Sequence, residues 1–282
     1  AEPELVVDTQ HLAGEPPWNR PHAIAVDESS GEVFALQENF ILVFSLDLKH
    51  LRTIGGRGTA PGQFAGPFQI CVDPSTSFLL ISDRVNRRVQ VIDPRGSGAP
   101  EAQLHSNRPE CTSLNGVAVD PVSRRIFVVE SFGRCIRVFS QADYSFLFEF
   151  GAPPTPAFKS STAQDSNNPA ALSEPFGLCF DEKERELYVA DGCSCSVKVF
   201  DVDGRFRRSF PTSGDPVGIT LNPVTSEVIV SYLANKLEVF SLSGLPLRKR
   251  EFPSSIVKKF AAGVCVHRGT GHVFVADPND SK

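Results

Sequence analysis

The chain has 282 residues, a formal net charge of −5 and no methionine. Its 41% content of hydrophobic residues excludes an intrinsically disordered chain, and no apolar run approaches the roughly 18 residues that a membrane-spanning helix needs. All-β domains often exceed 200 residues, so this length fits one domain over residues 1–282. A start at Ala1 without any methionine predicts an excised fragment or a processed product.

The chain contains seven cysteines. An odd number argues against a framework of disulfides, and free thiols are typical of a reducing compartment. We therefore expect a cytoplasmic protein.

Short apolar segments that end in an acidic or turn residue recur along the whole chain. Four of their five spacings lie near roughly 40–50 residues, the period of a propeller blade, and the spacing before the fourth copy is longer. The six segments are Ala23–Asp27, Gln69–Asp73, Gly116–Asp120, Gly177–Asp181, Gly218–Asn222 and Gly263–His267.

Further apolar segments follow each of these after turns rich in Asp, Ser, Pro and Gly, which suit tight reversals. Val, Ile, Phe and Leu dominate them without any helical period, so the segments are predicted to be strands. The second strands are Glu32–Leu36, Phe78–Ser82, Arg125–Val129, Glu186–Ala190, Glu227–Ser231 and His272–Ala276. The third strands are Ile41–Phe44, Arg88–Ile92, Cys135–Phe139, Ser196–Phe200 and Lys236–Phe240, and the fourth are Leu51–Ile54, Phe146–Phe150, Arg205–Phe210 and Leu247–Phe252.

Four antiparallel strands repeated six times predict an all-β, six-bladed β-propeller. A linear β-solenoid fits less well, because each unit returns by hairpins. The sixth copy stops where its third strand should begin. We expect Glu4–Thr9 to supply the outermost strand of that last blade and so to cover an exposed sheet edge. The third strand of this blade has no evident source, so we predict a missing strand, a truncated chain or an N-terminal segment that slides inward.

The residues of the second copy resemble the NHL repeat. This copy reads Pro61-Gly62-Gln63-Phe64, then Asp83-Arg84-Val85-Asn86-Arg87-Arg88, then Val89-Gln90-Val91-Ile92. The NHL pattern runs from a Gly-x-Gln-Phe turn to an Asp-x-x-Asn-x-Arg corner and an apolar strand. The resemblance covers residues 20–278 and implies an NHL-type propeller. WD repeats fit poorly because the only Trp is Trp18, and kelch repeats fit poorly because their Gly-Gly pair is missing from the blades.

The repeat pauses over residues 152–174, a segment rich in Pro, Ser, Asn and Ala. This composition predicts a flexible insertion loop, and an ordered loop that binds a partner is the alternative.

The sequence gives little support for catalysis, and we predict neither a metal site nor a cofactor. Cys71, Cys179 and Cys265 occupy every second inner strand, where small size explains the choice. Cys193-Ser194-Cys195 is too closely spaced for the usual zinc knuckle and has no second pair. NHL-containing amidating lyases hold zinc with several Pro-His pairs, whereas only Pro21-His22 matches here. Calcium-dependent propeller lactonases need acidic and amide side chains at the axis, where this chain has Ala23, Gln69, Gly116, Gly177, Gly218 and Gly263.

Loops between blades, and those between second and third strands, should lie on one rim of the propeller. We predict that this rim carries a basic, aromatic binding patch in blades one to three, with Phe40 beside it. The predicted binding residues are Arg57, Arg84, Asn86, Arg87, Arg88, Phe132 and Arg134. Arg87 and Arg134 could instead bridge blades.

In TRIM-type NHL proteins this rim recognises RNA or proteins, so the resemblance implies a recognition module. The sequence pI of about 5.7 opposes strong nucleic-acid binding, and Arg is common in protein interfaces. We therefore expect a non-catalytic domain with a protein partner, in a larger protein such as a ubiquitin ligase with RING, B-box and coiled-coil segments. Single-stranded RNA is the alternative partner and a metal-dependent propeller enzyme is a weaker one. We expect neither DNA nor membrane binding.

Overall fold

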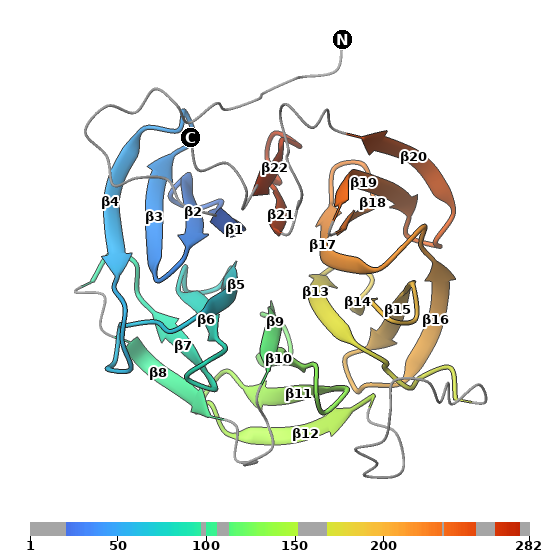
Figure 1. The fold of residues 1–282 in the computed structure, drawn as a ribbon, viewed down its shortest axis with the longest axis horizontal. Helices are drawn as coiled ribbons and strands as arrows, with labels where there is room; N and C mark the ends of the chain where they lie inside the picture. The colour runs from blue at the N-terminus through green and yellow to red at the C-terminus, as the bar shows by residue number, and fades with distance from the viewer. Residues whose placement is uncertain are drawn as a thin grey trace.

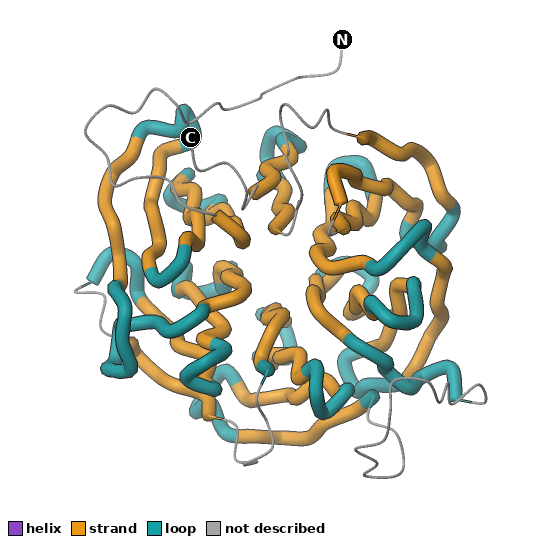
Figure 2. The backbone as a smooth tube through the Cα atoms, viewed as in Figure 1, coloured by secondary structure: helices purple, strands orange, loops and turns teal. Residues whose placement is uncertain are grey.

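The computed structural model describes residues 21–96, 100–105, 113–151, 168–232, 234–251 and 263–276. Within these ranges, 22 strands form six antiparallel sheets around a central axis, and the described residues form no helix (Figures 1 and 2). The architecture is therefore that of an all-β propeller. In the part of the chain described, no helix could cross a membrane.

Five sheets are complete four-stranded blades, in which the first strand lies innermost and the fourth outermost (Figure 1). The first two blades comprise β1 (Pro21–Asp27), β2 (Glu32–Gln37), β3 (Phe40–Ser45) and β4 (His50–Gly55), then β5 (Pro67–Val72), β6 (Leu79–Asp83), β7 (Arg88–Ile92) and β8 (Pro100–His105). The other three comprise β9 (Leu114–Asp120), β10 (Arg125–Glu130), β11 (Cys135–Ser140) and β12 (Phe146–Phe150), then β13 (Pro175–Asp181), β14 (Glu186–Asp191), β15 (Ser196–Asp201) and β16 (Phe206–Pro211), then β17 (Pro216–Asn222), β18 (Glu227–Tyr232), β19 (Ala234–Ser241) and β20 (Pro246–Glu251).

The sixth sheet has only two described strands, β21 (Gly263–Val266) and β22 (Val273–Ala276). β21 packs against both β17 and β1, so the inner wall closes into a ring. The sequence predicted six blades with the last one open to being incomplete, and the structure describes five complete blades, because no third strand pairs with β22 among the described residues. Glu4–Thr9 lies outside the described residues.

The hydrophobic core lies between neighbouring blades. One buried cluster joins Phe34 and Ile41 of the first blade to Ile70 and Ile81 of the second. Similar clusters join each later pair of blades, and Phe274 of β22 packs against the first blade. A blade therefore depends on its neighbours for burial of both faces, as in other repeat architectures.

The turn between first and second strands is held by the same device in each of the six sheets. The last residue of the inner strand, or the residue just after it, accepts hydrogen bonds from the backbone of its own turn, as in an Asx-turn. The acceptors are Asp27, Asp73, Asp120, Asp181, Asn222 and, through its ring Nδ1, His267. The polar residue that closes each apolar segment in the sequence thus has a local structural role.

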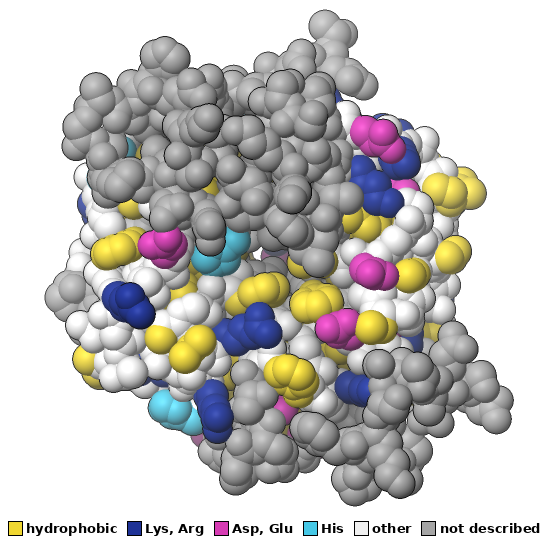
Figure 3. Space-filling view, in the orientation of Figure 1, with side chains coloured by type: hydrophobic (Ala, Val, Ile, Leu, Met, Phe, Trp, Pro, Cys, Tyr) yellow, Lys and Arg dark blue, Asp and Glu magenta, His cyan; other side chains and the backbone are white. Residues whose placement is uncertain are grey.

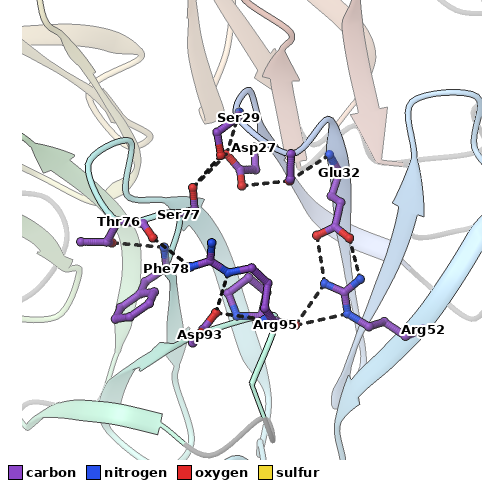
Figure 4. A network of polar contacts seen from close by, with 11 residues as sticks. Asp27, Ser29, Glu32, Arg52, Thr76, Ser77, Phe78, Asp93 and Arg95 are labelled. Carbon is purple, nitrogen blue, oxygen red and sulfur yellow. Dashed lines mark hydrogen bonds and ion pairs between the residues drawn. The ribbon is translucent and has the colours of Figure 1, made fainter.

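Arginines of the outer strands connect neighbouring blades. Arg52 of β4 binds both carboxylate oxygens of Glu32 at 2.5 and 2.9 Å, and it also donates to the Pro94 carbonyl of the next blade (Figure 4). Arg208 of β16 repeats this arrangement with Glu186 and the Leu242 carbonyl. Bidentate Arg–carboxylate pairs fix geometry well, so these arginines set how adjacent blades stack.

Candidate functional site

The meander of each blade defines two rims. The upper rim carries the turns between second and third strands and the connections between blades. The lower rim carries the other two turns of each blade. The starts of the inner strands meet at the upper rim, where a Cβ on Gly177 would lie 2.5 Å from the Val217 carbonyl oxygen. Inner strands this close leave a narrow centre, and the cavity at its mouth measures about 20 Å³, room for about one water molecule.

Three predicted binding residues place unneutralised positive charge on the upper rim. Arg57 and Arg84 flank the inner strand of the second blade, and Arg134 lies in the β10–β11 turn. Within the described ranges, none of the three has a carboxylate partner. Most other arginines do, for example Arg185 with Asp120 and Arg248 with Glu227. The upper rim of blades one to three therefore carries three arginines without a carboxylate partner among the described residues, together with the exposed Glu38 of the β2–β3 turn.

Arg88 and Asn86 have structural roles instead. The Arg88 guanidinium is buried, lies 3.0 Å from the buried Asp83 carboxylate and donates to the carbonyls of Ala60 and Gln63. The Asn86 amide donates to Asp83 and to the Gly58 carbonyl. Both hold the connection between blades one and two, so Arg88 is not available to a partner at the surface.

Apolar side chains accompany the arginines on this rim. Phe132 is 62% exposed, Val85 is 69% exposed and Phe40 is 38% exposed. Arg87 is exposed at the same corner as Val85, with a left-handed backbone φ of 55°. Exposed aromatic and aliphatic side chains beside arginines are a common composition of recognition surfaces.

Sequence reasoning missed the middle of the site. The rings of Phe68 and Phe176, from the inner strands of blades two and four, lie 6.5 Å apart, and the Arg84 guanidinium stands 5.8 Å from the Phe68 ring centre. His22 makes a hydrogen bond of 2.6 Å to the Pro67 carbonyl beside them. Figure 3 shows hydrophobic, basic and histidine side chains around the centre of this face. Both Phe residues follow a proline, as His22 does, and that shared repeat position was the available signal.

The opposite sector of the upper rim carries two carboxylates near Lys236 of β19, whose ammonium donates to Ser213. Glu174 and Asp215 have no basic ion-pair partner in the part of the chain described. Instead their carboxylates accept hydrogen bonds from two thiols, Cys193 at 2.8 Å and Cys195 at 3.2 Å. The bond to Glu174 raises the pKa of the Cys193 thiol to about 11, so this thiol is protonated at neutral pH.

Part of the predicted insertion loop borders this sector. Leu172 is buried, and the backbone amides of Ser173 and Glu174 donate to the Asp191 carboxylate. Residues 168–174 are therefore packed against the fourth blade, whereas residues 152–167 lie outside the described part.

The described residues include no group of three His, Cys, Asp or Glu side chains placed to hold a metal ion. Burial raises the pKa of the Cys71, Cys179 and Cys265 thiols, as expected for packing residues between blades. A larger hollow of about 440 Å³ on the lower rim is lined by charged side chains that pair with one another, such as Arg207 with Asp201.

No family model matches this chain. "NHL repeat-containing protein 2" of Gallus gallus is 22% identical over 249 residues, which is 83% of this chain and 25% of that protein. The chain thus spans about a quarter of that relative's length. Among solved structures, one titled "Streptogramin B lyase structure" aligns with a TM-score of 0.64 and 13% identity, covering 95% of this chain and 83% of its own. A hydrazine synthase of Kuenenia stuttgartiensis aligns with a TM-score of 0.51 and 18% identity, covering 66% and 49%.

The two structures show the propeller fold alone. Both carry the names of enzymes, whereas the sequence relative is named only for its repeat, so the fold does not decide between catalysis and binding. The relative found by sequence indicates the type of repeat, because its name states that it contains NHL repeats. Together with the Gly62-Gln63-Phe64 turn and the Asp83–Arg88 corner, the comparisons support a similarity of this chain to NHL-type β-propellers.

Proposed function

We propose that this chain is a non-catalytic recognition module that binds a protein partner through the upper rim of blades one to three. The observation that carries the proposal is that Arg57, Arg84 and Arg134 have no carboxylate partner among the described residues and lie beside the exposed side chains of Val85 and Phe132. Elsewhere the protein pairs most of its arginines with carboxylates, so these three on one rim suit a partner that supplies the missing acceptors.

The module works within a larger multidomain protein in this proposal, such as a ubiquitin ligase, and in the cytoplasm. The support for a larger protein is that the chain spans a quarter of its NHL-repeat relative. The ligase context rests on the resemblance to TRIM-type proteins, and the gene sequence on both sides of this chain tests it. A gene without ligase domains would contradict that context and leave the binding proposal intact.

The proposal also includes a sixth blade around β21 and β22. The other second strands are almost wholly buried, whereas Val273 of β22 is 40% exposed. An apolar strand edge of this kind normally has a partner. In this proposal Glu4–Thr9 provides the outermost strand of the sixth blade. The reason is that β1, which follows this segment in the chain, contacts β21 and β22.

A random 12-residue peptide library displayed on phage tests the binding surface. We expect selected peptides that bind the wild-type protein and lose at least tenfold in affinity on Phe132→Ala or Arg57→Glu. Arg124→Glu is the matched control, since Arg124 is an exposed, unpaired arginine on the lower rim of the described residues. Peptides unaffected by both upper-rim changes would place the binding surface elsewhere.

Single-stranded RNA is the second candidate, because Arg84 stacked on Phe68 could grip a phosphate and a base. Random single-stranded RNA is titrated at 50 and 200 mM salt. RNA recognition predicts a steep fall of affinity with salt and its loss in Arg84→Ala, and we expect no binding at either salt concentration.

A further inference from the structure

Charge on the upper rim is divided between two sectors. Arg57, Arg84 and Arg134 belong to blades one to three and lack carboxylate partners among the described residues, while Glu174 and Asp215 border blades four and five and lack basic ones. Figure 3 shows acidic and basic side chains spread over this face, in places next to one another. The three arginines of blades one to three give a partner on this rim three groups that attract negative charge.

This division limits how long an anionic partner can be. A nucleic-acid strand carries a phosphate on every nucleotide, so its binding groove must stay positive along its course. Here the three arginines give way to the Glu174 and Asp215 carboxylates, and the whole chain has a net charge of −5. A short acidic segment satisfies the arginines without reaching these two carboxylates.

The apolar side chains limit the partner further. Val85 is aliphatic, so it offers no face for stacking a base, and Phe132 exposes 62% of its surface in a separate turn. Phe68 lines the channel mouth and its ring lies 6.5 Å from that of Phe176, and the mouth is too narrow to admit a side chain. Such a surface buries Leu, Ile or Phe side chains laid across it.

Resting on the proposed function, we infer that the partner segment is a short acidic peptide with apolar anchors. Its Asp or Glu carboxylates pair with Arg57, Arg84 and Arg134, and its aliphatic or aromatic side chains cover Val85, Phe68 and Phe132. Bidentate Arg–carboxylate pairs give the orientation, and the apolar contact supplies most of the affinity.

The composition of the phage-selected peptides tests this inference separately from the proposed function. We expect enrichment of Asp and Glu together with Leu, Ile or Phe. A synthetic copy of the leading peptide should bind at least tenfold more weakly when its Asp and Glu are changed to Asn and Gln. A comparable loss is expected when its apolar residues are changed to Ala.

The protein side uses Arg57→Glu and Arg84→Glu, with Arg124→Glu as the lower-rim control and thermal unfolding as the check on folding. Loss of binding in the first two alone supports the inference. Neutral or basic peptides that still depend on Phe132 would overturn the inference while the proposed function stands. Failure of every selected peptide to depend on the upper rim would overturn the proposed function itself.

Discussion

Arg84 and Arg88 lie four positions apart in one corner and have opposite environments. Arg88 points beneath the connection between blades and neutralises a buried carboxylate, whereas Arg84 lies over the Phe68 ring at the surface. In the sequence both are arginines of a basic run. Their roles differ because the loop formed by residues 56–66 folds over Arg88 and leaves Arg84 at the surface. The spacing of the repeats does not predict the course of such a loop.

Removal of the Arg88 guanidinium should destabilise the fold strongly. Arg88→Ala leaves the Asp83 carboxylate buried without its cation and removes the hydrogen bonds from Arg88 to the carbonyls of Ala60 and Gln63. Breaking a buried ion pair in this way costs about 3 kcal/mol of unfolding free energy or more, measurable by urea denaturation. Arg95→Ala is the control, because its pair with Asp93 is exposed and should contribute under about 1 kcal/mol. Equal effects of the two changes would contradict the structural role of Arg88.

Cys193 should react slowly with alkylating agents despite its exposure. Its hydrogen bond to Glu174 raises the thiol pKa to about 11, so little thiolate exists at pH 8. Glu174→Gln removes the carboxylate and lowers the pKa of the Cys193 thiol, so the fraction of thiolate increases. A thiolate of lower pKa is a weaker nucleophile, which offsets part of this gain. The net gain in alkylation rate is about tenfold. Peptide mass spectrometry after iodoacetamide treatment measures the rate at Cys193, and an unchanged rate would contradict the pairing.

Among elements, β22 completes the contact between the last sheet and the first blade. Phe274 packs against Val33, Leu42 and Phe44, which belong to β2 and β3. Phe274→Ala should therefore lower the unfolding free energy by about 2 kcal/mol, less than for a fully buried Phe. Val273→Ala removes an exposed side chain of the same strand and should change the unfolding free energy by under about 0.5 kcal/mol. Denaturation curves compare the two, and equal losses would refute the closing contact.

Most strands could be predicted from the sequence, because apolar segments between turn residues recur with one period. Phe146–Phe150 and Arg88–Ile92 were predicted with the observed bounds. β8 was missed, since Pro100, Glu101 and Gln103 obscure the alternation of Ala102 and Leu104. An outermost strand buries only one side chain in two against its neighbours, so its hydrophobic signal is the weakest in a blade.

For the whole molecule, metal removal should leave the fold unchanged. No group of three potential ligands converges within the described residues. A metal bound at about 100 times its Kd would contribute about 2.7 kcal/mol to stability, so its removal would lower the Tm by at least about 5 °C. We expect EDTA to shift the Tm by less than about 1 °C in differential scanning calorimetry. A larger fall would reopen a metal-dependent function.

The site was predicted in part. Strand count placed Arg57, Arg84, Phe132 and Arg134 on one rim, because turn position in a meander follows from strand order alone. The contact of Phe68 with Phe176 joins blades two and four across the axis. Such a contact depends on the closure of the whole ring, which no local pattern in the sequence describes.

Ring closure also has a consequence for synthesis of the protein. The Glu28 carboxylate accepts a hydrogen bond from the Arg268 backbone, a contact between residues 240 positions apart. At about 5–20 residues per second, a ribosome needs about 10–50 s to make the intervening chain. Throughout that interval the growing chain carries a first blade whose face toward β21 and β22 is uncovered. During synthesis, nascent chains therefore expose an apolar blade face that favours aggregation. A chaperone that covers this face would raise the yield of folded protein.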